Sequence, residues 1–501
     1  MNFEKAKKLL TQLSVFYFLL AAMIFFVAGD GFRHEIVNGS ALSPSSVIGE
    51  IVDGMVVEQR LPLGADHVEA LNLQVATFGR QNTGILHVDI YGEDGTLISS
   101  AQGRLEDMGD NQVIRFSFAE SLDGMRKQYS TVKIWSEGCQ PGNAITVYYG
   151  NGIQAGKYTL QKGIASEDLY QVDGTSGSGT LCAYFNGYND LIFYKVYWLL
   201  ILFVYAAVAV VIRRWWNQAK QGKCNPLTTF YAMVVQYGFL TRQLVSRDFK
   251  TKYKRSLLGV GWSILNPLLT MLVQYVVFST LFSSGTKNYP VYLLTGIVFF
   301  NFFNEAINMG MTSITSNAAL IKKVYMPKYI YPVSRVFSSL INLGTSLIPL
   351  LAVMLLTRIW PKWSLLLLVF DILCLVVFVM GMSLILSTCM TFFQDTLFLW
   401  GVVSMIWMYL TPIFYMDTII PEKFLALYHM NPMYQYINFA RICIIDGVSP
   451  NPISYLWCIL TAVVVFAIGV SVFRKNQNRF VLYCLLYTLR AHETCADLVC
   501  R

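Results

Sequence analysis

Eight long apolar runs constrain the fold of this chain more than any other feature. Each has roughly the 20 residues that a helix needs to cross the hydrocarbon core of a membrane. Only 14% of the 501 residues are charged, whereas a soluble domain carries roughly 25%. The sequence therefore predicts a polytopic α-helical membrane protein. The apolar runs are residues 13–29, 191–212, 258–282, 289–310, 333–356, 363–390, 397–416 and 453–473.

Charge is divided unevenly along the chain. Residues 30–190 hold 20 acidic and 10 basic residues, whereas the rest of the chain holds 10 acidic and 28 basic ones. Cytoplasmic loops of membrane proteins carry an excess of Lys and Arg. We therefore expect a multi-pass protein of the inner or plasma membrane, with 30–190 extracytoplasmic and the basic stretch 213–255 inside. The first run, of 17 apolar residues, exceeds the roughly 7–15 of a signal peptide, which favours a retained anchor over a cleaved leader.

The extracytoplasmic block has a different pattern. Segments between residues 60 and 155 alternate apolar and polar side chains, and glycine-containing turns separate them. Short strands at such intervals predict an antiparallel β-sandwich between two membrane anchors. Cys139 and Cys182 are the two cysteines of this block. Outside the cytoplasm they are able to form a disulfide, and two free thiols are the alternative.

The same block carries aromatic side chains of the exposed type. Because sugars stack well on aromatic faces, we hypothesise that this domain binds a glycan outside the membrane. Packing in the core of the sandwich, or contact between two copies of the chain, is the alternative. The aromatic residues are Trp135, Tyr148, Tyr149, Tyr184 and Tyr188.

An amphipathic helix is expected between the second anchor and the next apolar run. At 100° per residue, Leu227, Phe230, Tyr231, Val234, Tyr237 and Leu244 share one side of residues 227–246. Pro226 suits the first helical turn. Such a helix lies along the membrane surface rather than across it. It leads directly into the basic cluster Arg247, Lys250, Lys252, Lys254 and Arg255.

Four ordered blocks carry a family resemblance. RDFKTKYKRSLLGVGWSILNPLLTML begins at Arg247, NAALIKKVYMPKYIYPVSRV at Asn317, WMYLTPIFYMDTIIPEKF at Trp407 and NPMYQYINFAR at Asn431. Together they resemble permease subunits of ABC transporters that export lipid-linked polysaccharides and polyol phosphates, such as O-antigen and teichoic acid. The resemblance spans roughly residues 225–480 and implies a six-span permease core, to which this chain adds two spans and the β-sandwich.

The resemblance implies partners for this chain. Permeases of this family work as a homodimer with a separate ABC ATPase subunit, which would carry the ATP and Mg²⁺. The basic loop 311–334 would be the coupling loop seated in that subunit, and a solvated loop that obeys the charge bias is the alternative. The coupling residues would be Asn317, Leu320, Lys322, Lys323, Tyr325, Met326 and Pro327.

The resemblance also implies a lipid-linked glycan as substrate. Its diphosphate headgroup would approach the membrane beside the basic cluster, where cations attract phosphate. Control of topology and binding of anionic membrane lipids explain the same cations equally well. The headgroup-binding residues would be Arg247, Lys250, Lys252, Lys254 and Arg255.

Two polar and aromatic stripes are candidates for a passage through the membrane. Asn301, Asn304, Glu305 and Asn308 recur at helical spacing, and polar groups at membrane depth face a partner helix or a water-filled cavity. Helix packing explains the stripes as well as a channel does. The lining residues would be Phe299, Asn301, Phe303, Asn304, Glu305, Asn308, Trp400 and Trp407.

Missing motifs narrow the function. The sequence contains no GxxxxGK[ST] loop and no HExxH or GxSxG motif, so we expect neither ATP hydrolysis nor another catalytic activity, and no metal or cofactor. Charges deep in the spans are few, with Glu305 and Asp371 the clearest, whereas ion-driven carriers usually have more. A passive conduit with an external motor is favoured. The alternatives are a membrane-anchored carbohydrate-binding protein, a membrane glycosyltransferase, or an ABC permease for a lipid or small molecule.

The expected organisation follows from these segments. An anchor precedes the sandwich, and a second anchor leads to the interfacial helix, the permease domain and a tail. No binding of nucleic acid is expected. The boundaries are 1–29 for the first anchor, 30–190 for the sandwich, 191–224 for the second anchor, 225–256 for the interfacial segment, 257–475 for the permease domain and 476–501 for the tail.

Overall fold

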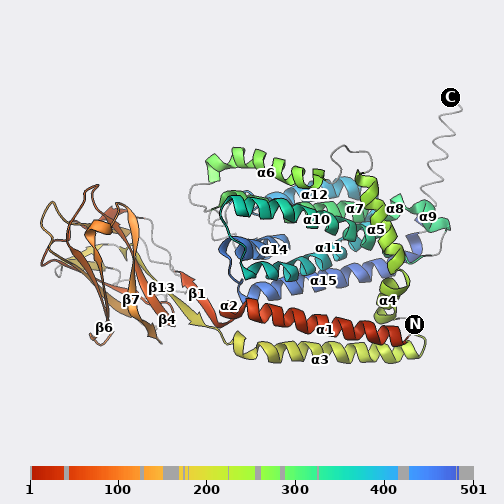
Figure 1. The fold of residues 1–501 in the computed structure, drawn as a ribbon, viewed down its shortest axis with the longest axis horizontal. Coiled ribbons are helices and arrows are strands. Elements are labelled where there is room, and N and C mark those ends of the chain that lie inside the picture. Colours follow the sequence, from red (N-terminus) through yellow and green to blue (C-terminus); the bar gives the residue numbers. More distant parts are fainter. Residues whose placement is uncertain are drawn as a thin grey trace. The chain divides into compact units, whose positions relative to one another are not determined.

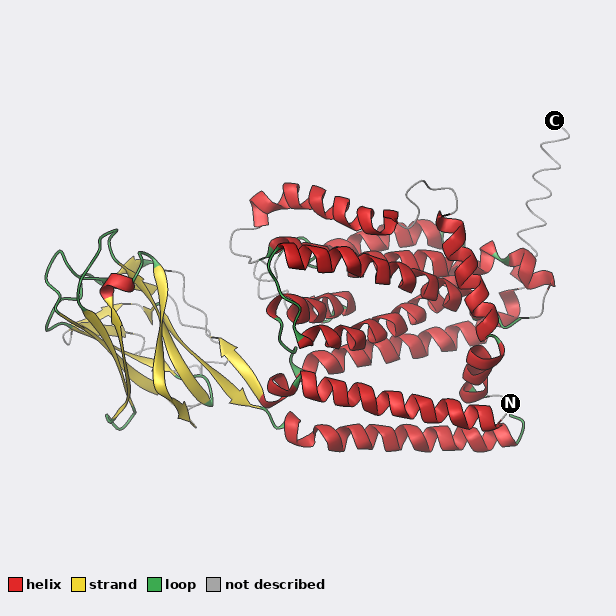
Figure 2. Ribbon diagram, in the orientation of Figure 1, coloured by secondary structure: helices red, strands yellow, loops and turns green. Residues whose placement is uncertain are grey.

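The chain forms two compact units, which Figure 1 traces. One is Arg33–Tyr194; the other combines Met1–Phe32 with Lys195–Arg501. The computed structural model describes residues 3–38, 44–123, 129–150, 169–172, 175–178, 180–223, 225–253, 261–282, 288–323, 326–415, 428–480 and 482–483. Figure 2 shows that the first unit is built of strands and the second of helices. The predicted fold class, a polytopic helical protein with an inserted β-domain, is confirmed.

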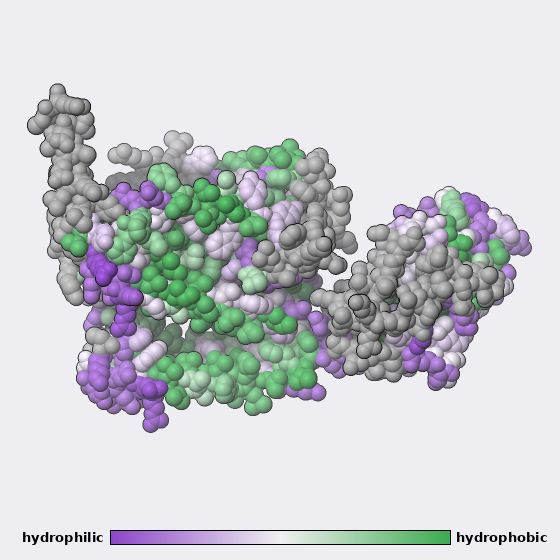
Figure 3. Space-filling model, turned by 180° about the vertical axis from the view of Figure 1, so that it is seen from behind, coloured by the Kyte–Doolittle hydropathy of each residue, from purple (hydrophilic) through white to green (hydrophobic). Residues whose placement is uncertain are grey.

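Seven helices in the described residues are long and apolar enough to cross a membrane. Many of their apolar side chains are exposed, and Figure 3 shows a broad hydrophobic surface over this unit. Such a surface suits contact with lipid rather than water. The helices are α1 (Phe3–Val27), α3 (Phe193–Lys220), α6 (Gly261–Phe282), α7 (Tyr289–Met311), α10 (Ile330–Leu356), α11 (Leu367–Phe392) and α15 (Pro452–Asn476).

The eighth expected span is shorter than its apolar run. Residues 397–416 were predicted to cross the membrane, but helix α12 covers only Thr396–Leu410. Its 15 residues reach about 22 Å at ~1.5 Å per residue, less than the ~30 Å hydrocarbon core. Pro412 follows the helix and has no N–H with which to continue it. The next helix in the described residues is α14 (Pro432–Arg441), which precedes α15.

Glycines allow the central helices to approach closely. A Cβ on Gly381 of α11 would lie 2.6 Å from the backbone nitrogen of Phe466 on α15. One on Gly469 of α15 would lie 2.9 Å from Cα of Gly381. Helices in membranes associate through such small residues because lipid is as apolar as the side chains themselves. These contacts hold α11 against α15.

The expected interfacial helix is broken into three parts. Helix α4 (Pro226–Tyr231) has Asn225 as N-cap in a capping box with Thr228, and Pro226 lies in its first turn as predicted. A π-helical turn at Ala232–Gln236 precedes α5 (Gly238–Tyr253). The single regular helix predicted for residues 227–246 is therefore wrong. Its apolar residues are divided between α4, the turn and α5, where Leu227, Tyr231 and Leu244 are buried and Phe230 and Val234 are exposed.

The smaller unit is a two-sheet sandwich. Within the described residues one sheet runs β1-β13-β4-β9-β12, with β2 beside β9 and β7 beside β4, and the other runs β11-β10-β3-β8-β5-β6. The strands are β1 (His34–Asn38), β2 (Ser46–Val47), β3 (Val56–Pro62), β4 (His67–Ala76), β5 (Ile85–Tyr91), β6 (Leu97–Arg104), β7 (Gln112–Asp123), β8 (Tyr129–Glu137), β9 (Thr146–Gly150), β10 (Leu169–Val172), β11 (Thr175–Ser178), β12 (Thr180–Leu181) and β13 (Ala183–Asp190).

Strand alternation explains the core of this unit. In β8 every second side chain is buried, so Val132 and Ile134 face the other sheet. The aromatic residues predicted to be exposed lie outside this core and are half-buried. They are Trp135, Tyr148, Tyr149, Tyr184 and Tyr188.

Cys139 and Cys182 are both buried and free, so no disulfide joins them. Cys139 follows β8 in one sheet, whereas Cys182 lies between β12 and β13 in the other. Burial raises the pKa of the Cys139 thiol, and that of the Cys182 thiol to about 11. Both thiols therefore stay protonated near neutral pH, and the alternative of two free thiols holds.

Candidate coupling and transport site

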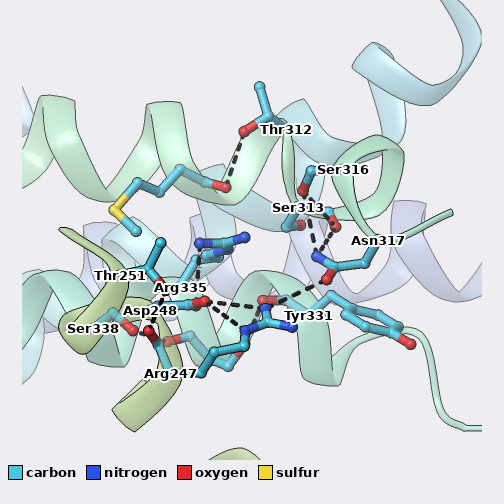
Figure 4. Close-up of polar contacts among 12 residues, drawn as sticks. Arg247, Asp248, Thr251, Thr312, Ser313, Ser316, Asn317, Tyr331, Arg335 and Ser338 are labelled. Atoms are coloured by element: carbon cyan, nitrogen blue, oxygen red, sulfur yellow. Dashed lines mark hydrogen bonds and ion pairs between the residues drawn. The ribbon is translucent and has the colours of Figure 1, made fainter. Parts of the chain in front are cut away.

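An ion-pair cluster around one buried carboxylate joins the interfacial helix to the permease core (Figure 4). Asp248 on α5 has a side chain that is only 4% exposed. Its Oδ2 lies 3.1 Å from Nη1 of Arg335 at the start of α10, and its Oδ1 lies 3.0 Å from Nη2 of Arg247. A buried carboxylate in its charged form needs opposite charges nearby to offset the cost of leaving water. This cluster, Arg247, Asp248 and Arg335, is called the Asp248 cluster below.

The Asp248 cluster reaches the loop that was predicted to couple to an ATPase. Arg247 donates from Nη2 to Oδ1 of Asn317 at 3.5 Å, and Asn317 Nδ2 donates to the backbone oxygen of Ser313 at 2.8 Å. Asn317 lies between the short helices α8 (Ser313–Ser316) and α9 (Ala318–Lys323). Figure 4 shows these side chains converging from α5, α10 and the loop. The loop is therefore bonded directly to the interfacial helix.

Apolar packing supports the same junction. Leu244 of α5 and Ile321 of α9 belong to one buried cluster with Met326. Leu320 packs against that cluster, and Pro327 is half-buried. The side chains of Lys322 and Lys323, and all of Tyr325, lie outside the described residues.

The predicted headgroup cations have different surroundings. Arg247 belongs to the Asp248 cluster, and Lys252 lies 2.6 Å through Nζ from Oε1 of Glu305. Lys250 is exposed on α5. Lys254 and Arg255 lie outside the described residues. Arg247, Lys250 and Lys252 are all exposed, the first and the last while ion-paired.

Glu305 connects three helices. Besides Lys252 of α5, its Oε1 accepts a hydrogen bond from Nδ2 of Asn342 on α10 at 2.7 Å, while Glu305 itself belongs to α7. Glu305 was predicted to line a passage. In this structure it bonds to side chains of α5 and α10 and so links both helices to α7.

The remaining predicted lining residues divide into two groups. Asn301 and Asn308 are exposed on α7, and Asn304 is half-buried. Phe299 and Phe303 are fully buried, and the Phe303 ring lies 6.1 Å from Trp400 and 5.2 Å from Trp407 between centroids. The aromatic stripe thus lies in helix packing, the alternative that the sequence left open.

Arg335 pairs with Asp248, and Asn342 donates to Glu305. Neither residue was identified from the sequence. Each is a polar residue in or beside the apolar run 333–356. Polar groups at membrane depth normally have partners. That rule is the one feature of the sequence that could have pointed to Arg335 and Asn342. Which carboxylate each one meets depends on α5 and α7, which are distant in the sequence.

The arrangement is that of a polytopic membrane protein with a charged junction at one end of its helices. The sequence profile of the ABC-2 type transporter family matches residues 240–445. The O-antigen export system permease protein RfbA of Klebsiella pneumoniae is 30% identical over 256 residues, which cover 50% of this chain and 97% of the relative. The chain belongs to the ABC-2 type transporter permeases and is a multi-pass protein of the inner membrane.

Two further relatives match the same half of the chain. The RfbA protein of Myxococcus xanthus, also named as an O-antigen export permease, is 26% identical over 247 residues, 49% of this chain and 95% of its own. The polysialic acid transport protein KpsM of Escherichia coli is 21% identical over 248 residues, 47% of this chain and 92% of its own. The predicted family resemblance is therefore confirmed for the permease half.

Proposed function

We propose that this chain is the transmembrane subunit of an ATP-driven exporter that moves a lipid-linked polysaccharide across the inner membrane. The permease half supports this, since relatives matched over nearly their whole length are named for the export of O-antigen and the transport of polysialic acid. The bonded junction between loop 311–334 and the interfacial helix carries the proposal. A teichoic-acid-like polymer is an alternative substrate of the same class.

Two copies of the chain would work with two copies of an ABC ATPase, which holds the ATP and Mg²⁺. Closure of the ATPase would push on α9. Because Asn317 is bonded to Arg247, and Asp248 to Arg335, that push would move α5 and the inner end of α10 together. Glu305 would carry the movement to α7. The lipid headgroup would bind beside Lys250 and its basic neighbours.

The test uses Lys322→Glu together with Lys323→Glu in the full chain with its ATPase in proteoliposomes. We expect export to be lost while membrane insertion is retained, because the loop contacts a partner rather than the substrate. Lys475→Glu is the matched control, since Lys475 is an exposed cation at the end of α15 and outside the loop. Export at the normal rate by the double variant contradicts the coupling assignment.

The ATPase requirement is tested separately. The purified chain alone should hydrolyse no ATP, and hydrolysis should appear when the ATPase subunit is added. Turnover by the chain alone contradicts the permease assignment.

A second function, glycan binding by the unit Arg33–Tyr194, is proposed from its aromatic surface. Trp135 is half-buried, stacks on His87 with centroids 4.0 Å apart, and donates from Nε1 to Oδ2 of Asp89 at 2.8 Å. An aromatic ring beside polar side chains suits a polyhydroxylated ligand.

Titration of the full chain in nanodiscs with the cell's own surface polysaccharide tests this function. Trp135→Ala should weaken saturable binding. If Trp135→Ala binds the polysaccharide as well as the wild type does, the unit does not have this role. The same follows if the wild type shows no binding at millimolar concentrations of repeat units.

A further inference from the structure

Helices α1 and α3, called the anchor pair below, are mostly uncovered by the rest of the protein. Tyr17 of α1 donates to the Ile201 oxygen at 3.0 Å, and Tyr197 of α3 donates to the Ala21 oxygen at 2.8 Å. The two helices therefore lie side by side, as Figure 1 shows. Within α3, all of which is described, only Tyr197 is buried. Both helices lie outside residues 240–445, which match the transporter family.

A groove runs along one side of the anchor pair. It has a volume of about 520 Å³ and is lined by residues of α1 from Thr11 to Ala22 and by Trp198 of α3. Thr11 and Ser14 bring hydroxyl groups to the lining, but each donates to a backbone oxygen of its own helix at 3.0 Å. The groove therefore offers an apolar surface at membrane depth.

The groove has the length of an acyl chain in one leaflet of a bilayer. From Thr11 to Ala22 the helix rises ~16 Å, at ~1.5 Å per residue. One leaflet supplies half of the ~30 Å hydrocarbon core, which is about 15 Å. One chain of a phospholipid is thus able to lie along the whole groove.

Cations lie at one end of this groove. At ~100° per residue, Lys7 and Lys8 fall on the same side of α1 as residues 11–22, about one turn before them. On α3, Arg213 lies about 60° around the helix axis from Trp198. All three cations are exposed, and the described residues supply no ion-pair partner to any of them. Lys7, Lys8 and Arg213 are called the anchor cations below.

The antiparallel pairing of the two helices brings Arg213 to the level of the two lysines. The Phe3 ring lies 5.4 Å from the Trp216 ring between centroids, and the Tyr205 hydroxyl donates to Ser14 Oγ at 3.4 Å. Arg213 lies between these two contacts along α3, and the lysines lie between them along α1. The anchor cations therefore gather at one mouth of the groove.

We propose that the groove binds one membrane phospholipid of net negative charge, with an acyl chain along residues 11–22 and the phosphate beside the anchor cations. Lys and Arg next to a membrane attract anionic headgroups, and the charge bias predicts that this lipid comes from the cytoplasmic leaflet. Glu4 lies on the same side of α1, one turn further from the groove, so the phosphate would lie on the groove side of the lysines. The proposal is independent of the export function.

The test is photolabelling of the full chain in phosphatidylcholine nanodiscs. Two probes carry the same photoreactive acyl chain, one on phosphatidylglycerol and one on phosphatidylcholine, and peptide mapping locates the label. At low probe concentration the phosphatidylglycerol probe should label residues 11–22 roughly 100-fold more, since each of the three cations contributes a factor of about five. Equal labelling by the two probes would show ordinary lipid contact only and would overturn the proposal.

The triple variant Lys7→Gln/Lys8→Gln/Arg213→Gln should remove the preference for phosphatidylglycerol. Arg214→Gln is the matched control, because Arg214 is also exposed but lies about 160° around the axis of α3 from Trp198. It should keep the preference. A preference that survives in the triple variant contradicts the role of the anchor cations.

Ala22→Trp tests the groove without changing a charge. The larger side chain should fill the groove and lower labelling of residues 11–19 by the phosphatidylglycerol probe, and labelling at the wild-type level would contradict the proposed position of the acyl chain. Unlabelled phosphatidylglycerol should displace the probe. If purified lipid-linked polysaccharide displaces it and phosphatidylglycerol does not, the occupant is the transported lipid and the proposal is wrong.

Discussion

The carboxylate of Asp248 lies 3.1 Å from the guanidinium of Arg335, and this ion pair joins α5 to the first turns of α10. Removing one partner of a buried pair leaves the other charge uncompensated, at a cost of ~3–5 kcal/mol. Because Arg335 keeps one-fifth of its side chain exposed, we expect Asp248→Asn to lower the free energy of unfolding by about 2–3 kcal/mol. Thermal unfolding in detergent measures the loss.

Lys250→Gln serves as the control because Lys250 is exposed on the same helix. It should change the stability by less than about 0.5 kcal/mol. The double variant Asp248→Asn/Arg335→Gln should lose less than the sum of the two single variants, since the residues interact. Additive losses would show that the pair is not an energetic unit.

The bond between Lys252 and Glu305 predicts a loss of export when the charge is removed. Glu305→Gln should slow export, because α5 is then held less firmly against α7. Exchanging the charges, Lys252→Glu with Glu305→Lys, should restore part of the rate. Restoration should be incomplete, since Asn342 also donates to Glu305 and cannot serve a lysine in the same way.

Export rates in proteoliposomes, at matched protein content, measure both effects. Because both side chains are partly exposed, the coupling in stability should be only about 0.5–1 kcal/mol. Export at the wild-type rate by Glu305→Gln contradicts this prediction.

Asp371 offers a test of the passive-conduit interpretation. It is fully buried in α11, and neither carboxylate oxygen has a hydrogen-bond partner among the described residues. A buried polar group without a partner costs about 1–3 kcal/mol. Asp371→Leu should therefore raise the melting temperature and leave export unchanged. Loss of export by a stable Asp371→Leu protein would indicate that this carboxyl takes part in transport.

The stability of the unit Arg33–Tyr194 should depend on pH through His67. The Asp123 carboxylate 2.6 Å from its Nδ1, with Asp190 near Nε2, raises the pKa of His67 above its ordinary 6.5. The folded state therefore binds the proton more tightly than the unfolded state. Its stabilisation is complete below pH ~6.5 and is lost as the pH rises through the raised pKa.

Limited proteolysis of the unit in the full chain, between pH 5 and 9, measures this dependence. His67→Gln should flatten the profile. His87→Gln is the control, because His87 pairs with Glu137 on the other sheet. An unchanged profile in His67→Gln would contradict the assignment.

Local patterns determined the broad organisation of this protein. Long apolar runs specify membrane helices because every backbone group in lipid must be paired within the segment. Period-two alternation specifies strands of a sandwich because successive side chains face opposite sides of a sheet. The excess of Lys and Arg predicts the orientation, and Pro226 marks a helix start. Each of these features depends on neighbours in the sequence.

Only the tertiary structure decided which polar groups meet. Lys252 pairs with Glu305, and Asp248 with Arg335, across separations that no local pattern encodes. Phe303 and Trp400 face helix packing because of how α7 and α12 are rotated about their axes. The apolar run after residue 397 looked like a full span, yet it ends at Leu410. It is able to end there because Arg441 and Tyr292, brought by other helices, satisfy the carbonyls that the missing helical turns would have paired.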